Sequence, residues 1–170
     1  MIFSNPSEYA IRALSELTLM TAEGEMSAGA EAAVEGGQTM TDAARSRRTR
    51  YVQLDTVTAQ SSLPREFLAK IFRQLVAQGI LVSAKGPGGG FALSRPPHEI
   101  TLLQVMEAVD GAHQLDGCVV GLAKCNDHMP CPQHDLFKPI RQRLRAYLST
   151  TTLADTAASL KEKKAYAQAR

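Results

Sequence analysis

The fold is decided by residues 61–96, which read SSLPREFLAKIFRQLVAQGILVSAKGPGGGFALSRP. Pro64 suits the first turn of a helix and Gly79 suits the residue after its last turn, which predicts a helix over about 64–78. Its apolar face is expected to carry Phe67, Leu68, Ile71, Leu75 and Val76. The β-rich runs 80–83 and 91–93 flank a glycine loop, so a β-hairpin should follow this helix.

Upstream of this stretch, Val52, Leu54, Val57 and Ala59 fit a short helix that ends in a turn at Ser61 and Ser62. Two helices joined by a tight turn form a helix-turn-helix. A glycine-tipped hairpin directly after it makes this unit a winged helix. The fold class is therefore mainly α with a small β-hairpin wing.

The amino-terminal part predicts one amphipathic helix over about 6–21, with Asn5 as its cap. Residues 22–42 then contain four glycines and five acidic residues without a periodic apolar face. We expect a mobile insertion over about 22–50, closed by the basic run 45–50.

The carboxy-terminal part predicts two more helices. Thr101 and Gly111 are suited to begin and end the first. A long helix should start near Asp135, with Pro139 tolerated only in its first turn or so. Its apolar seam comprises Phe137, Ile140, Leu144, Tyr147 and Leu148. A single chain of this size has little core left to cover the seam, which favours a homodimer.

Composition restricts the class of protein. The chain has 170 residues, of which 44% are hydrophobic and 21% charged, as expected for one globular core with an appended segment. No apolar run approaches a membrane span, and the start MIFSNPSEYA lacks the features of a secretory signal. We expect a cytoplasmic protein without a membrane partner. Three cysteines are too few for a disulfide scaffold and point to thiolate or metal chemistry.

The net charge of +2 conceals a strongly basic middle. Residues 43–95 carry nine basic and two acidic side chains, whereas residues 1–42 carry one basic and seven acidic ones. Such a surplus suits a phosphate-binding surface, although a solvated charged face gives the same count. The candidate DNA contacts are Arg65, Lys70 and Arg73 on or beside the second helix of the helix-turn-helix, and Lys85, Gly88 and Gly89 at the hairpin tip. The glycine loop lacks the residues of a nucleotide-binding loop, so a hairpin tip is the better interpretation.

The three cysteines and a histidine form the pattern Cys118-x6-Cys125-x5-Cys131-x2-His134 in a polar loop. The residues leave three interpretations open: an iron-sulfur cluster, a structural zinc ion, or unligated redox thiols. The absence of a Cys-x2-4-Cys knuckle disfavours zinc, and well-separated single cysteines favour a cluster. His128 is a further, weaker ligand candidate.

The wing, the segments SEYAIRAL, EITLLQVMEAVDG and TTLADTAASL, and the three-cysteine loop together resemble the Rrf-type winged-helix transcription regulators. The resemblance covers nearly the whole chain except residues 22–50. It implies a homodimer on a double-stranded DNA operator and a cluster held near the dimer helix. The implied domains are a DNA-binding domain (1–111), a cluster-binding loop (112–134), and a dimerisation helix with a tail (135–170).

The same resemblance implies that Cys118, Cys125 and Cys131 bind the cluster. His134 matches the fourth ligand of IscR-like members, which implies 2Fe-2S. Glu8 matches the carboxylate that NsrR-like members take from the partner subunit, often with 4Fe-4S. The first cysteine gap is one residue wider than the family's common pattern, and the insertion is unusually long.

The sequence thus predicts a non-enzymatic transcription regulator, with no small-molecule substrate, whose operator affinity depends on an iron-sulfur cluster. The alternative is a winged-helix regulator with zinc or a thiol switch at the same cysteines. An iron-sulfur enzyme is the weakest interpretation, because no general base or nucleophile pair accompanies the cysteines.

Overall fold

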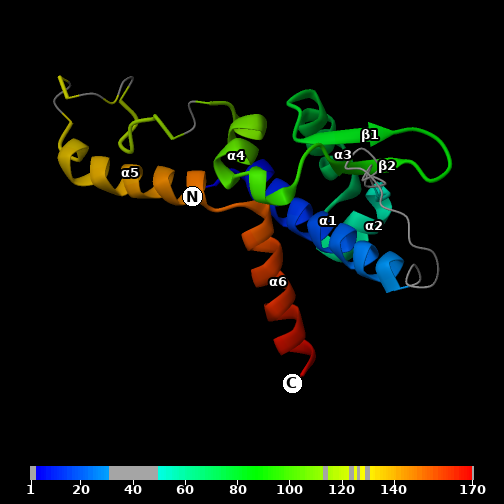
Figure 1. The fold of residues 1–170 in the computed structure, drawn as a ribbon. Helices are drawn as coiled ribbons and strands as arrows, with labels where there is room; N and C mark the ends of the chain where they lie inside the picture. Colours follow the sequence, from blue (N-terminus) through cyan, green and yellow to red (C-terminus); the bar gives the residue numbers. More distant parts are fainter. Residues whose placement is uncertain are drawn as a thin grey trace, which may run out of the picture.

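The structure is a computed structural model that describes residues 3–30, 50–112, 115–122, 125, 127–128 and 131–169. It is mainly helical with a two-stranded antiparallel wing, as the sequence predicts (Figure 1). The elements are α1 (Asn5–Ala30), α2 (Leu54–Ser61), α3 (Arg65–Ala77), β1 (Leu81–Ala84), β2 (Gly90–Leu93), the short 3-10 helix η2 (Pro97–Glu99), α4 (Leu102–Asp110), α5 (His134–Thr150) and α6 (Leu153–Gln168). None of the described helices is long and apolar enough to cross a membrane.

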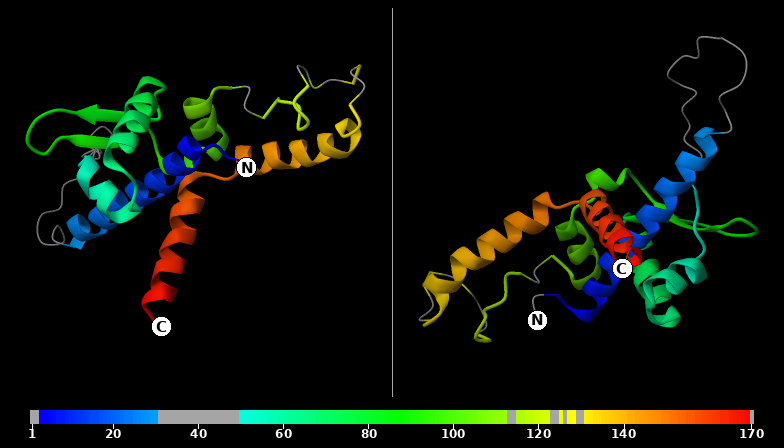
Figure 2. Two further views of the ribbon diagram at one scale, coloured as in Figure 1. Left: turned by 180° about the vertical axis from the view of Figure 1, so that it is seen from behind. Right: turned by 90° about the horizontal axis from the view of Figure 1, so that it is seen from below.

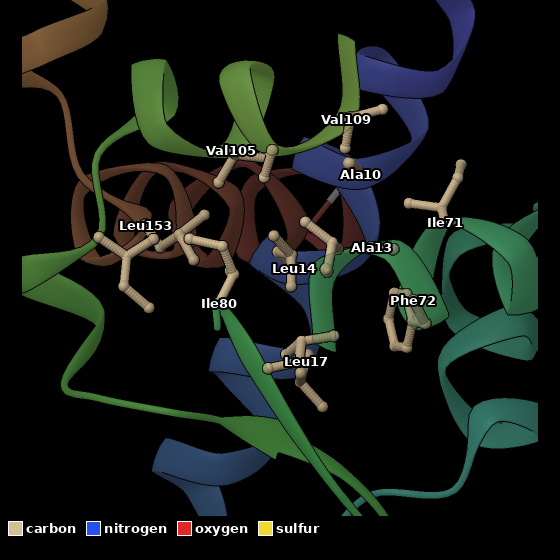
Figure 3. Packing of buried hydrophobic residues seen from close by; sticks show 14 of the residues in the cluster. Ala10, Ala13, Leu14, Leu17, Ile71, Phe72, Ile80, Val105, Val109 and Leu153 are labelled. Atoms are coloured by element: carbon tan, nitrogen blue, oxygen red, sulfur yellow. The ribbon is translucent and has the colours of Figure 1, made fainter. Parts of the chain in front are cut away.

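The hydrophobic core lies where α1 packs against α3, α4 and α6 (Figure 3). Leu14 and Leu17 of α1 are fully buried at its centre. Each buried leucine of this kind stabilises the fold by about 1.5–3 kcal/mol relative to an exposed one. The other elements contribute Ile71, Phe72, Ile80, Val105, Val109 and Leu153. The core therefore fixes the helix-turn-helix and α4 as one unit.

The prediction for α1 was wrong at both ends. The helix continues to Ala30, so residues 22–30 are helical rather than part of a mobile insertion, and residues 31–49 lie outside the described residues. Ser4, not Asn5, caps the start, because the Ser7 N–H donates to Ser4 Oγ at 3.1 Å. The Ser4 and Ser7 hydroxyls also donate to the carboxylate of Asp110, at the end of α4, at 2.6–2.7 Å.

The helix-turn-helix and wing have the predicted order, with two local corrections. Val52 is not helical: it exchanges two backbone hydrogen bonds of 2.9 Å with Phe91 and so forms an isolated β-bridge beside the two strands of the wing. Phe67 is 47% exposed, and Phe72 fills the core in its place, edge-on to the Phe91 ring. Gly79 follows α3 with a φ of +71°, as its predicted role after the last turn requires.

The predicted long helix is α5, and a further helix, α6, follows it where a tail was expected. The chain breaks at Thr151, whose carbonyl accepts from Leu102 N–H at 2.9 Å, and Thr152 then caps α6 through a capping box with Asp155. Pro139 is the sixth residue of α5, deeper than expected, and has no N–H to donate to the Asp135 carbonyl. α5 projects from the body on the side opposite the wing, whereas α6 runs in a different direction (Figure 2).

α6 returns to the core instead of forming a tail. Ser15 of α1 donates to Thr156 at 3.0 Å, and the Lys164 ammonium pairs with the nearly buried Glu16 carboxylate at 2.6 Å. Leu153 and Ala157 are buried against the body. α6 is therefore anchored to α1, while the Leu102–Thr151 bond ties the end of α5 to α4.

Candidate functional site

The candidate DNA-binding face consists of α3 and the wing. Arg65, Lys70 and Arg73 are all exposed on α3, as a phosphate-binding role requires. Arg65 is also engaged within the chain: its Nε donates to the carboxylate of Asp55 in α2, which raises the pKa of the Arg65 guanidinium. A phosphate that binds Arg65 must therefore compete with Asp55.

The tip of the wing is open and depends on glycine. Lys85 and Gly88 are exposed, and Gly88 has a φ of +76°, a conformation that residues with a Cβ rarely adopt. Gly89 is half-buried at the tip. Gly90 lies so close to the Val52 carbonyl that a Cβ there would collide with it. The predicted wing residues thus sit together at an exposed tip.

The cysteine loop connects α4 to α5 and lies along α5, far from the wing (Figure 1). It arranges its candidate ligands in two pairs. The Sγ atoms of Cys118 and Cys131 are 3.9 Å apart, and Cys125 Sγ lies 3.3 Å from His134 Nδ1. Among the described residues, no three His, Cys, Asp or Glu side chains gather as ligands of one ion.

These two pairs fit a cluster with two metal ions. Two thiolates on one tetrahedral ion, with metal–sulfur bonds of about 2.3 Å, lie about 3.8 Å apart. The Cys118–Cys131 separation of 3.9 Å matches this spacing. An imidazole nitrogen and a thiolate form an equally acceptable pair for an iron ion. The residues present therefore suit 2Fe-2S, in which each iron takes two protein ligands.

Arg141 of α5 lies among these thiols. Its Nη2 donates to Cys125 Sγ at 3.2 Å and to the Gly117 carbonyl at 3.0 Å, and its guanidinium lies over the Phe137 ring. Its Nε is buried and has no hydrogen-bond partner among the described residues. The half-buried Arg141 side chain therefore places a positive charge beside the sulfur of Cys125.

The pKa of the Cys118 thiol is lowered by its surroundings. Backbone N–H donation from Val120 lowers its pKa most, and Leu122, Cys131 and Arg141 contribute in the same direction. Because a thiolate is both the metal ligand and the nucleophile, this environment suits ligation and thiol chemistry alike.

His134 is the first residue of α5 and is 9% exposed. Its Nε2 lies 2.8 Å from Asp127 Oδ1, and the same oxygen accepts from Lys138 Nζ at 2.7 Å. The Lys138 ammonium and His134 lower the pKa of Asp127 to about 2, so Asp127 is a carboxylate and His134 Nε2 is the donor. The other imidazole nitrogen, Nδ1, then faces Cys125 Sγ.

Glu8, the alternative fourth ligand, is exposed on α1 and pairs with Arg12 at 3.8 Å. Within the described part of the chain, Glu8 forms this ion pair inside α1 and none with the cysteine loop.

Sequence reasoning missed Asp127, Lys138 and Arg141. His134, Lys138 and Arg141 follow one another at spacings of four and three, so they share one face of α5. That spacing on a predicted helix next to a cysteine loop is a sequence signal that identifies Lys138 and Arg141 as candidate site residues. Asp127 lies in an irregular loop, and no periodicity identifies it.

Gln74 was also missed, because it lies outside the apolar face that the sequence predicts for α3. Its Nε2 donates to the carbonyls of Ala108 and Val109 at 3.1 and 2.8 Å. These are among the last carbonyls of α4, which helices leave without intrahelical partners. Gln74 therefore joins α3 directly to the end of α4 from which the cysteine loop departs.

The fold and the site together define a winged-helix regulator with a thiol-rich loop. Two solved structures share the fold: CymR, the global cysteine regulator of B. subtilis, with a TM-score of 0.64, 19% identity, and coverage of 92% of this chain and 96% of that chain; and T. potens IscR, with a TM-score of 0.62, 16% identity, and coverage of 94% and 88%.

The protein belongs to the Rrf2 family, described as iron-dependent transcriptional regulators, whose profile matches residues 31–159. A candidate HTH-type transcriptional regulator of Aquifex aeolicus is 27% identical over 157 residues, which cover 91% of this chain and 90% of that protein. The HTH-type transcriptional regulator IscR of Klebsiella pneumoniae is 28% identical over 116 residues, which cover 68% of this chain and 71% of that protein. The protein is thus a transcription regulator of this family.

Proposed function

We propose that this regulator binds operator DNA as a homodimer and that an iron-sulfur cluster on the cysteine loop sets its affinity. The observation that carries the proposal is the two donor pairs, Cys118 with Cys131 and Cys125 with His134, in a member of an iron-dependent family. When bound, the cluster supplies a centre whose charge responds to oxidation, nitrosylation or loss of iron.

The proposed DNA contacts are the exposed cations of α3, with Lys85, Gly88 and Gly89 at the wing. Phosphate neutralisation by Arg65, Lys70 and Arg73 would supply most of the affinity, and the wing tip would reach the adjacent groove. The exposure of all four cations in the structure supports this assignment.

The proposed dimer uses α5, which projects from the body (Figure 2). Leu136 and Ile140 are 70% and 57% exposed on it, and Tyr147 is 53% exposed near its base. Tyr147 also borders a hollow of about 710 Å³ between α1, α2 and α6. Exposing several large apolar side chains to water is unfavourable, so we propose that a second copy of α5 buries them in the dimer. Ile140→Glu should produce monomers in sedimentation, whereas Gln142→Glu on the same helix should not.

The proposed coupling runs through the end of α4. The cysteine loop starts directly after Asp110, which is bonded to Ser4 and Ser7, while Gln74 of α3 bonds the preceding carbonyls. A change in the loop therefore acts on a segment that is bonded to the DNA-binding helix. This connection is the proposed route by which a change in the loop would alter DNA affinity.

His134 is the proposed fourth ligand, ahead of Glu8 of the partner subunit. The support is its position 3.3 Å from Cys125, and the two donor pairs favour 2Fe-2S over 4Fe-4S. His134→Ala should change the visible spectrum strongly and Glu8→Ala only slightly. The reverse pattern would assign the ligand to Glu8.

A thiol switch is the second candidate, because Cys118 has a lowered pKa and its Sγ lies 3.9 Å from Cys131. Anaerobically purified protein distinguishes the candidates. We expect visible absorption, equal amounts of iron and sulfide, and loss of both in Cys118→Ala, Cys125→Ala and Cys131→Ala, with the dimer retained. Colourless protein with zinc, or with thiols and no metal, would support the alternatives.

A further inference from the structure

Asp127 and Lys138 lie behind the Cys125–His134 pair and determine which imidazole nitrogen faces the thiol. Both ring nitrogens of the buried His134 are occupied: Nε2 by Asp127 at 2.8 Å and Nδ1 by Cys125 at 3.3 Å. An imidazole that used Nε2 as a ligand would have to leave Asp127 and turn within a buried site.

Asp127 is itself fixed to α5. Its Oδ1 accepts from Lys138 Nζ at 2.7 Å in addition to His134 Nε2. Lys138 lies one helical turn after His134, so the two side chains of α5 hold one loop carboxylate between them. This arrangement ties Asp127 to the helix that carries the histidine, although the carboxylate is mostly exposed.

We propose that Asp127 is a positioning residue that keeps a proton on His134 Nε2 and presents Nδ1 as the cluster ligand. The proposal rests on the proposed cluster function and deepens it. A carboxylate on the remote nitrogen of a ligating histidine fixes its tautomer and ring orientation and makes the ligating nitrogen more basic. Lys138 anchors Asp127, and neither residue contacts the metal.

The nitrogen that binds can be identified in the unmodified protein. Anaerobically purified protein is prepared with histidine labelled with ¹⁵N at Nδ1 only, and separately at Nε2 only. Hyperfine spectroscopy of the reduced cluster then distinguishes the two nitrogens. We expect the strong coupling from labelled Nδ1 and only a weak, remote coupling from labelled Nε2. Strong coupling from Nε2 would overturn this inference alone. A cluster with no histidine coupling would overturn both the inference and the assignment of His134.

The positioning role is tested with a matched control on the same loop. Asp127→Ala should weaken iron retention against a chelator by about 10- to 100-fold, the usual cost of losing such a partner. Asp127→Asn keeps an acceptor oxygen and should restore part of this loss. Asp116→Ala removes another loop carboxylate, which pairs with Arg145 of α5 at 2.6 Å, and should leave retention unchanged. Equal retention in Asp127→Ala and Asp116→Ala would refute the role of Asp127. The labelling result on the unmodified protein stands even if a variant folds poorly.

Discussion

Lys70→Ala isolates one proposed phosphate contact in the centre of α3. Lys70 is exposed, and it forms no ion pair with the residues that the structure describes. The substitution therefore leaves no partner charge uncompensated. A dimer loses two contacts, and each contact contributes about 0.9 to the slope of log affinity against log salt concentration on duplex DNA.

The expected magnitude follows from this slope. Between 50 and 200 mM salt, one contact accounts for about a 3.5-fold loss of affinity and two contacts for about a 12-fold loss. The affinity of the wild-type protein should therefore fall about 12-fold further over this range than that of Lys70→Ala.

Fluorescence anisotropy with a labelled duplex at several salt concentrations measures both the affinity and the slope. The control is Lys161→Ala, which removes the same charge from an exposed position on α6. A slope that does not differ between the two variants would show that Lys70 contacts no phosphate, and the proposed DNA face would be wrong.

Three further predictions concern contacts within the chain. Asp55→Asn should release Arg65 for DNA and tighten binding, because a phosphate no longer has to compete with the Asp55 carboxylate for the guanidinium. Glu162→Gln on α6 is the control, and weaker or unchanged binding in anisotropy would contradict this. Gln74→Leu should lower the free energy of unfolding in urea by about 1–3 kcal/mol, because it leaves two carbonyls of α4 without their partner. It should also reduce the difference in DNA affinity between cluster-bound and cluster-free protein. No change in either quantity would show that Gln74 does not couple the loop to α3. Asp155→Asn should destabilise the protein most above about pH 4. Hydrogen bonds from Thr152 lower the pKa of Asp155 below its ordinary 3.8. The stability that the Asp155 carboxylate contributes is therefore present above that value and is lost as the pH falls through the lower folded-state pKa. Urea unfolding at pH 6 and pH 3 checks this, and a larger difference at pH 3 would reverse the sign.

The winged helix was predictable because its signals are local. Gly79, the glycine tip, Thr101 and Gly111 each mark one boundary, and the structure places a boundary at each. The Thr101 side chain even accepts from Gln104 N–H in a capping box, as a residue of this type before an apolar run suggests.

The predictions from sequence were wrong where contacts between distant parts of the chain determine the local structure. The break between α5 and α6 depends on backbone bonds to Ile100 and Leu102, about fifty residues earlier, although the Thr152–Asp155 pair was readable as a helix start. The wrong choice of Phe67 as a core residue instead of Phe72 has the same origin. Phe72 is the buried ring because it packs against Phe91 of the wing, a contact that the sequence of α3 alone does not reveal.

The candidate site was predictable in composition and not in geometry. The spacing of the cysteines and His134 identified the ligands to consider. Their pairing, the Asp127 carboxylate and the Arg141 cation depend on how an irregular loop lies against α5, which periodicity does not encode.

The central claim is that the state of the cysteine loop controls DNA affinity. Its most direct test is one duplex, selected from random fragments by the cluster-bound protein, titrated anaerobically with that protein and with the same sample after iron chelation. The account predicts two different dissociation constants, with Cys125→Ala matching the chelated sample under both conditions. Equal constants for the cluster-bound and chelated protein would contradict it.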